Sequence, residues 1–212
     1  MPSYSSKSKL IRLLDKFRYG LILHSIRNRL AWMGLLEISL SYLCKEELSD
    51  SLMPEIKCSL EEHSLEFFGP VDMNIIGEEN CGYKKERMLA MLKEGKKCFG
   101  IKHKGKIASF MWFDFDECNW YPYKFRLKKN EVYLFHLYTM YPFRGKNIAP
   151  YLRYKSYEVL KNMNRDTIYS LTEYFNSAAI KVNKKLNMKL LKFILYIELF
   201  RRFHWTFTIK TY

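Results

Sequence analysis

The sequence predicts an α/β protein, because strand and helix patterns alternate from about residue 65 to the end of the chain. First, Glu131–Thr139 is apolar or β-branched almost without a break, which is typical of a strand buried on both faces. Second, a basic run at Arg144–Ala149 follows, and the spacing of Ile148, Leu152 and Leu160 predicts a helix that begins there. Third, 212 residues with 48% hydrophobic side chains suffice for one cored domain and an extension.

Composition limits the partners and the compartment. The net charge of +14 favours polyanions, anionic membranes or acidic protein partners. The five cysteines form no C-x-x-C pair, and with no recognisable signal peptide they predict reduced thiols in the cytoplasm. The five histidines show no metal-ligand spacing, so no metal site is expected.

Residues 1–33 predict a basic amphipathic helix. Five apolar residues recur with a helical period, at Leu10, Leu13, Leu14, Phe17 and Leu21. Seven Lys or Arg and one acid occur in residues 1–30, so the helix either touches the inner face of an anionic membrane or packs on its own domain. Charges interrupt every apolar run before the ~20 residues of a membrane span. We therefore divide the chain into an extension with a linker, residues 1–62, and a main domain, residues 63–212.

The other predicted elements follow from apolar alternation, helical periods and turn residues. In chain order they are a weak strand at Leu35–Tyr42, a polar linker at Ser49–Glu62, a strand at Leu65–Phe68, a helix at Tyr83–Glu94, a hairpin of Cys98–Lys102 and Ile107–Phe115, a loop to Lys129, a strand at Thr167–Thr172, a helix at Ala179–Leu186, and two closing strands within Leu190–Lys210 separated by Arg201-Arg202.

The basic turn at Arg144–Ala149 has the chemistry of a phosphate cradle. It joins a strand to a helix, and the free N–H groups of a first helical turn favour an anion. Pro150 falls in that first turn, where it is tolerated. Neither G-x-G-x-x-G nor G-x-x-x-x-G-K-[ST] is present, and a solvated Arg and Lys remain the alternative.

The order of elements, together with two motifs, resembles the GNAT superfamily of acyl-CoA-dependent N-acyltransferases over about residues 63–212. Arg144–Ala149 (RGKNIA) resembles the R/Q-x-x-G-x-G/A turn that holds the coenzyme A pyrophosphate. About thirty residues later, Asn176–Met188 (NSAAIKVNKKLNM) resembles the N-x-x-A segment that ends in K-L-G-F. The resemblance implies a mixed, mostly antiparallel central sheet with flanking helices.

The resemblance also implies the residues that bind acyl-CoA. They lie at the end of the central strand, in the basic turn and in the second motif: Tyr138, Thr139, Met140, Arg144, Gly145, Lys146, Asn147, Ile148, Ala149, Asn176 and Asn183. The sequence departs from the family at two of them. Asn147 stands where glycine is usual, although Asn tolerates unusual backbone angles. Asn183 stands where many members carry a tyrosine proposed as general acid, and an amide cannot supply a proton at neutral pH.

A general base must remove a proton from the amine, and Glu131 and His136 are the candidates. Strand alternation places Glu131 on one face with Tyr133 and Phe135, and His136 on the other with Tyr138. Each has a structural alternative, because His136 can be a core histidine and Glu131 a surface residue ahead of the strand.

The acceptor predicted from the sequence is a small amine or amino sugar rather than nucleic acid, for which no motif is present. Three acids, Asp114, Asp116 and Glu117, can receive a cationic amine or form a solvated turn. The function predicted first is transfer of an acyl group, acetyl above all, from acyl-CoA to a primary amine. Two alternatives stay open: an acyl carrier protein as donor at the membrane surface, and a non-catalytic module that binds acyl-CoA or a polyanion.

Overall fold

The computed structural model describes residues 33–47, 53–57, 63–79, 82–120 and 123–212, so the predicted N-terminal helix lies outside the described residues. The chain forms two compact units. Unit 1 holds the chain up to Cys44 with Leu171–Lys184 and Met188–Tyr212, and unit 2 holds Lys45–Ser170 with Lys185–Asn187. The division at residue 62 stays a prediction.

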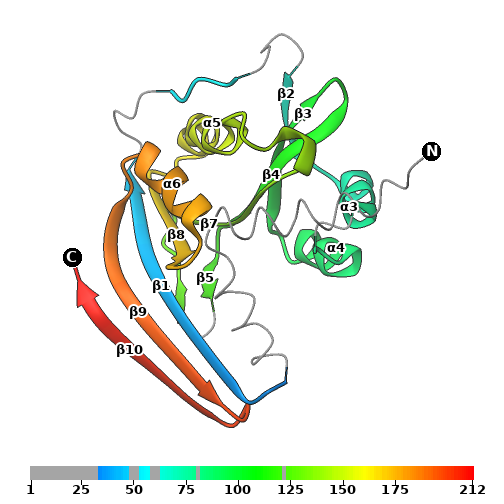
Figure 1. The fold of residues 1–212 in the computed structure, drawn as a ribbon. Helices are drawn as coiled ribbons and strands as arrows, with labels where there is room; N and C mark the ends of the chain where they lie inside the picture. The colour runs from blue at the N-terminus through cyan, green and yellow to red at the C-terminus, as the bar shows by residue number, and fades with distance from the viewer. Residues whose placement is uncertain (1–32, 48–52, 58–62, 80–81, 121–122) are drawn as a thin grey trace. The chain divides into compact units, whose positions relative to one another are not determined.

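Unit 2 is built on a mixed sheet with the strand order β8-β7-β4-β3-β2 (Figure 1). Its strands are β2 (His63–Phe68), β3 (Lys97–His103), β4 (Lys106–Asp114), β7 (Glu131–Thr139) and the first four residues of β8 (Thr167–Glu173). Neighbours run antiparallel except β7 and β8, which are parallel. The predicted mixed, mostly antiparallel sheet is confirmed.

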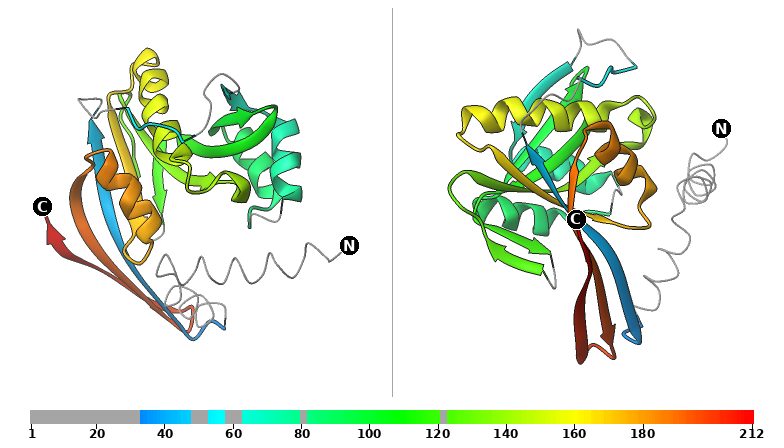
Figure 2. Two further views of the ribbon diagram at one scale, coloured as in Figure 1. Left: turned by 45° about the horizontal axis from the view of Figure 1, so that its top comes forward. Right: turned by 90° about the vertical axis from the view of Figure 1, so that its left-hand side faces the viewer.

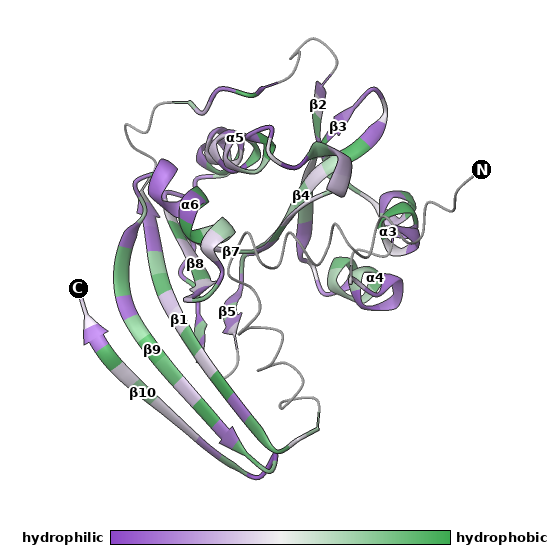
Figure 3. Ribbon diagram, viewed as in Figure 1, coloured by the Kyte–Doolittle hydropathy of each residue, from purple (hydrophilic) through white to green (hydrophobic). Residues whose placement is uncertain are grey.

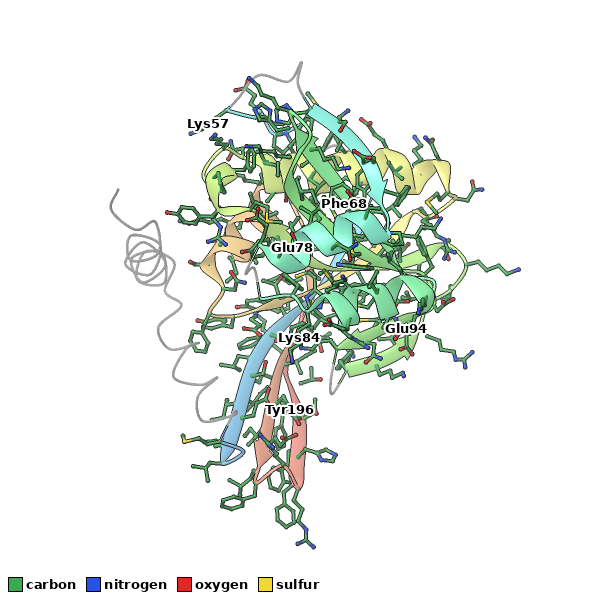
Figure 4. The ribbon with its side chains drawn as sticks, turned by 90° about the vertical axis from the view of Figure 1, so that its right-hand side faces the viewer. Lys57, Phe68, Glu78, Lys84, Glu94 and Tyr196 are labelled. Carbon is green, nitrogen blue, oxygen red and sulfur yellow. The ribbon has the colours of Figure 1, made fainter. Side chains whose placement is uncertain are left out.

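Two short helices, α3 (Pro70–Glu78) and α4 (Lys85–Lys93), lie between β2 and β3 in the chain. Figure 4 labels Phe68, Glu78, Lys84 and Glu94, which lie at or beside the ends of these helices. The predicted elements do not include α3. The Gly69-Pro70 pair after the strand at Leu65–Phe68 is typical of a turn, but proline also suits the first helical position. The Gly69 N–H donates to Asp72 Oδ2 over 2.9 Å and closes that first turn. Buried side chains of both helices and the sheet share one core, which includes Phe68, Met73, Ile76, Met88, Met91, Phe110 and Trp112.

The helix after β7 is α5 (Ile148–Asn162), preceded by a short 3₁₀ turn, η1 (Tyr141–Phe143). It packs against β3, β4 and β7, with Leu152 and Leu160 fully buried. The predicted loop before Lys129 is wrong, because β5 (Glu117–Trp120) and β6 (Tyr123–Arg126) form an antiparallel hairpin there. Alternation over only four residues per strand is too short a pattern to separate from a loop.

The described part of unit 1 has the strand order β10-β9-β1-β8 and the helix α6 (Ser177–Lys185), whose last residue belongs to unit 2. Strand β1 (Leu36–Glu47) confirms and extends the predicted strand at Leu35–Tyr42. The two closing strands are confirmed as β9 (Lys189–Leu199) and β10 (Phe203–Thr211), which pair as a hairpin around Arg201-Arg202 (Figure 2).

Candidate active site

The two halves of β7 differ in pairing and burial. Parallel pairing with β8 runs from Glu131–Thr167 to Leu134–Ser170, and Phe135–Thr139 continues beyond the last pair. The first four residues are buried and the last five are partly or fully exposed, so the prediction of a strand buried along its whole length is wrong. The register with β4 shifts between Phe135 and Tyr138, and His136 has a φ of 52°, which marks a β-bulge.

Backbone hydrogen bonds at the end of β7 show which edge each N–H faces. The Met140 N–H donates to the Ala108 carbonyl of β4 over 2.9 Å, and the Ser109 hydroxyl donates to the Tyr138 carbonyl over 2.7 Å. Because successive N–H groups of a strand point to opposite edges, the Thr139 N–H faces away from β4. The resemblance assigns Tyr138, Thr139 and Met140 to acyl-CoA binding. Of these three, Thr139 therefore presents its N–H on the edge of β7 opposite to β4, where pairing with β8 has already ended.

The basic turn adopts two left-handed conformations. Gly145 has a φ of 78°, and Asn147, which precedes α5, has a φ of 60° and a ψ of 18°. Asn147 thus takes a conformation that glycine adopts at no steric cost and that Asn tolerates better than most residues. A Cβ added at Gly145 would meet nothing within 4 Å, so the space beside this glycine is open.

The Asn147 side chain is held by residues that the sequence analysis did not connect with the turn. Its Nδ2 donates to the Glu55 carbonyl over 3.1 Å, and its Oδ1 accepts from Lys185 Nζ over 2.6 Å. The Lys57 N–H also donates to the Lys146 carbonyl over 3.0 Å. The segment Met53–Lys57 therefore lies against the turn, although nothing in its own sequence signals this. Lys185 belongs to the second motif, and this was the one sequence signal that linked any of these residues to the turn.

Arg144 folds back on the end of β7. Its Nε donates to the Thr139 carbonyl over 3.1 Å, and its Nη2 donates to the Tyr138 hydroxyl over 3.2 Å. The guanidinium also lies over the Tyr138 and Tyr141 rings, 5.4 and 5.6 Å from their centroids. These contacts hold its positive charge between the end of the strand and the turn.

The first turn of α5 supplies backbone donors. The first intrahelical bond beyond the cap runs from the Tyr151 N–H to the Asn147 carbonyl over 3.2 Å. The N–H groups of Ile148 and Ala149 precede it and have no acceptor within the helix, whereas Pro150 has no N–H. With Arg144, Lys146 and Lys185 beside these donors, the turn combines three side-chain cations with the positive end of the helix dipole.

His136 is exposed at the bulge and is not the core histidine that the sequence left possible. Its ring meets Tyr83 edge-on at 5.2 Å and Phe135 at 5.0 Å. Tyr83 also packs on Tyr138 at 5.6 Å, as expected if His136 and Tyr138 share a face. Desolvation first, and then the positive charge of Arg87, lower the pKa of His136, so its neutral form is favoured near neutral pH.

Glu131, by contrast, is buried and engaged within the fold. Its carboxylate accepts from the Lys128 N–H over 2.9 Å and from the Tyr169 hydroxyl over 3.3 Å. Its carbonyl accepts from Arg165 over 2.8 Å. Glu131 is therefore not a surface residue ahead of the strand. Its contacts close the turn that leads into β7, at the end of the strand opposite to the basic turn.

Two of the predicted acidic residues, Asp114 at the end of β4 and Glu117 at the start of β5, are likewise used in the fold. Asp114 is buried, lies 3.4 Å from Lys96 and accepts the N–H groups of Asp116 and Glu117 over 3.0 and 3.1 Å. Glu117 pairs with Lys124 across the β5–β6 hairpin at 2.9 Å. Asp114 is therefore not part of a solvated turn.

In unit 1, two asparagines of the second motif, Asn176 and Asn183, have structural partners. Asn176 Oδ1 accepts the Ala179 N–H over 3.1 Å and caps the start of α6. Asn183 Nδ2 donates to Thr172 Oγ1 over 2.9 Å and to Cys44 Sγ over 3.6 Å. The amide at the position of the usual family tyrosine thus ties α6 to its own sheet.

A buried polar network anchors α5 and was not predicted. Glu46, near the end of β1, accepts hydrogen bonds from Arg153 and Tyr157 of α5, and Ser170 of β8 donates to it over 3.2 Å. Burial, and then the neighbouring Glu46 carboxylate, raise the pKa of Tyr157, so its hydroxyl stays protonated. The network holds the helix that follows the basic turn, but its partners lie more than a hundred residues apart.

Within the described part of the chain, no group of three or more His, Cys, Asp or Glu is placed to hold a metal ion, and no helix is long and apolar enough to cross a membrane. The cysteines described, Cys44, Cys98 and Cys118, are buried thiols that form no disulfide with one another. Burial raises the pKa of Cys118 to about 12, which makes it a poor nucleophile.

No protein-family model matches the sequence, and no curated protein does. Solved structures match at low identity. A tandem GNAT protein from the clavulanic acid biosynthesis pathway is 14% identical with a TM-score of 0.56, over 86% of this chain and 58% of that one. A GCN5-related N-acetyltransferase from Sphaerobacter thermophilus is 14% identical with a TM-score of 0.56, over 81% and 55%. Another, from Kribbella flavida, is 9% identical with a TM-score of 0.54, over 81% and 63%.

This chain spans less than two thirds of the length of each of these three chains. The likeness extends over about four fifths of the present chain and shows that it has the fold of the GNAT superfamily.

Proposed function

We propose that this GNAT-fold chain is an acyl-CoA-dependent N-acyltransferase that moves an acyl group, acetyl in the first instance, to a primary amine of a small molecule or amino sugar. The observation that supports it most strongly is the turn between β7 and α5. Gly145 and Asn147 are both left-handed there, the space beside Gly145 is open, and the start of a helix follows.

The turn suits the diphosphate of coenzyme A. Backbone N–H groups of the left-handed turn and of Ile148 and Ala149 would donate to its oxygens. Arg144, Lys146 and Lys185 would supply charge, and charge-assisted hydrogen bonds contribute about 1.5–3 kcal/mol each. In this role Asn147 replaces the usual glycine because its own side chain is held by Glu55 and Lys185.

The open edge of β7 would bind the arm that carries the thioester. Beyond Leu134 the strand has no described pairing with β8, and the Thr139 N–H faces that edge. An N–H aimed at the carbonyl oxygen of the thioester stabilises the negative charge that develops there in the tetrahedral intermediate.

We assign the general base to His136 rather than to Glu131. The imidazole is exposed at the bulge and its lowered pKa favours the neutral form, whereas the Glu131 carboxylate is engaged by Lys128 and Tyr169. The amine nitrogen attacks the thioester carbonyl carbon as His136 takes its proton; the C–S bond then breaks and the amide and the thiolate of coenzyme A leave. Asn183 supplies no proton to that thiolate.

Isothermal titration with acetyl-CoA, followed by turnover on a panel of primary amines, tests the proposal. We expect saturable binding and acyl transfer that requires His136. Saturable binding without transfer on any amine would instead favour a non-catalytic acyl-CoA-binding module, which the engagement of Asn183 with Thr172 also fits. Failure of both acetyl-CoA and free CoA to bind would contradict the cradle itself.

A further inference from the structure

The hairpin of β9 and β10 in unit 1 turns an apolar face to solvent. Residues directly opposite in an antiparallel pair lie on the same face. The pairs Leu199–Phe203, Ile197–Trp205 and Leu195–Phe207 therefore form one face, and we call these six residues the outer hairpin face. Figure 3 shows apolar positions recurring along both strands.

The buried side chains of β9 lie on its opposite face. Ile194 and Tyr196, which alternate with the outer residues, are each 3% exposed; Figure 4 labels Tyr196. On the outer face Phe203, Trp205 and Phe207 are 49%, 45% and 50% exposed, and Phe203 stacks on Trp205 at 6.3 Å. A contiguous apolar row of this kind on an edge strand indicates an interaction surface.

The charge along β10 and the turn before it is of one sign, while Glu198 of β9 pairs with His204 on the opposite face of the hairpin. From Phe200 to Tyr212 the chain has three cations, Arg201, Arg202 and Lys210, and no acid. Arg202 lies over the Phe203 ring at 5.6 Å, and Lys210 lies over the Tyr212 ring at 4.4 Å. Positive charges therefore flank the aromatic row directly, whereas a second copy of the chain would bring like charges together.

The basic N-terminal part of the sequence joins unit 1 at the same hairpin. The Phe200 N–H donates to the Leu35 carbonyl over 3.1 Å, so the chain enters the described structure beside the β9–β10 turn. Residues 1–30 carry seven Lys or Arg and one acid. The residues that precede this point in the sequence therefore add to the positive charge of the chain.

We propose that the outer hairpin face docks on an anionic phospholipid surface. Trp and Phe side chains suit the boundary between headgroups and acyl chains, and adjacent Arg and Lys suit anionic headgroups. The docking is peripheral and rests on the hairpin, independently of the acyltransferase activity proposed above.

Flotation of the full chain with vesicles of phosphatidylcholine, with and without a minority of phosphatidylglycerol, tests this. We expect binding to the anionic vesicles that is at least about tenfold stronger than to the neutral ones and that weakens with salt. Trp205→Ser with Phe207→Ser should reduce anionic binding about tenfold or more. The matched control, Val71→Ser with Ile75→Ser, removes two apolar residues of α3 that are 71% and 44% exposed, and should bind as the parent does.

If the aromatic variant does not fold, as judged by circular dichroism, the double variant Arg201→Gln with Arg202→Gln replaces it in the vesicle assay. That pair should also lose about tenfold on anionic vesicles, while Lys128→Gln with Lys129→Gln should not. Parent-like vesicle binding by the hairpin variants, or no binding by the parent, would overturn the proposal. A dimer seen by light scattering that the aromatic variant abolishes, without vesicle binding, would overturn it in favour of a second copy as occupant.

Discussion

At the Glu131 end of β7 the strand is buried and pairs with both β4 and β8, whereas at the Thr139 end it bulges, loses its β8 partner and becomes partly exposed. Polar groups follow the same division. Glu131 is bound by Lys128 and Tyr169, while His136 is exposed at the bulge, where its ring meets Tyr83 and Phe135.

This difference separates polar residues that hold the fold from polar residues that can meet a ligand. A buried carboxylate with two hydrogen bonds is costly to move, because removal of one partner leaves the other unsatisfied. An exposed imidazole beside an unpaired strand edge can change its partner at little cost to the fold. Variants in each half of the strand, in the basic turn and in α5 test this division.

His136→Asn should have the largest effect on activity. Asn tolerates the positive φ at this position, so the bulge should persist. Loss of a general base lowers kcat by about 10²–10⁴-fold. Steady-state kinetics with acetyl-CoA and an accepted amine measure this, and unchanged CoA affinity by titration serves as the control. A variant that turns over at the parent rate would remove His136 from the mechanism.

The pH dependence follows from the lowered pKa of His136. The base acts in its neutral form, so kcat/KM should fall as pH decreases through a pKa below the usual 6.5. A pH–rate profile of the parent measures that limb, and His136→Asn should lose it. An acidic limb that persists in the variant would assign it to another group.

Arg153→Met should cost the most stability. It leaves Glu46 buried without its cation, which destabilises proteins by about 3–5 kcal/mol. The control is Lys155→Met, because Lys155 pairs with exposed Glu158 and such pairs contribute about 0–1 kcal/mol. Urea denaturation of both variants gives the two values, and equal costs would show that the buried network does not anchor α5.

Arg144→Ala should weaken CoA binding by about ten- to a hundredfold, since about 1.4 kcal/mol is one decade. The arginine is exposed and carries no core packing, so the free energy of unfolding should change little. Arg126→Ala, an exposed arginine on β6, is the matched control for the loss of one positive charge. Equal affinities of the two variants by titration would mean that Arg144 makes no contact with the ligand.

Glu131→Gln should have the smallest effect. The amide retains one acceptor oxygen for Lys128 or Tyr169, so we expect a stability loss of about 1 kcal/mol with turnover and CoA affinity unchanged. Stability is measured in urea, and turnover under the same buffer conditions. A tenfold or greater fall in kcat at parent-like stability would reverse the assignment and make Glu131 the base.

The sequence predicts the elements that depend on local patterns. The central strand, the basic turn, α5 and the two closing strands each occupy a continuous stretch with a clear period or turn signal. The conformation of the turn is also local, because Gly145 and Asn147 are residue types that accept a positive φ.

What the sequence misses depends on residues far apart in the chain. Arg153 meets Glu46 107 positions away, and Asn147 meets Glu55 92 positions away. The bulge at His136 follows from the register of β7 against β4, which no pattern within β7 encodes. The strand pattern alone does not distinguish Glu131 from His136 as the base. The two residues differ in their neighbours, which the pattern does not specify.

Titration of two glycine variants with two ligands shows whether the diphosphate of acyl-CoA lies in the turn. Gly145→Val and Gly105→Val place the same side chain at φ values of 78° and 74°, both with nothing within 4 Å, so backbone strain is matched. Against CoA, only Gly145→Val should lose affinity, by about ten- to a hundredfold. Against pantetheine, which lacks the diphosphate, both variants should bind alike. Equal CoA affinity of the two variants would show that the diphosphate does not lie in the turn. So would a loss of pantetheine affinity in Gly145→Val as large as its loss of CoA affinity.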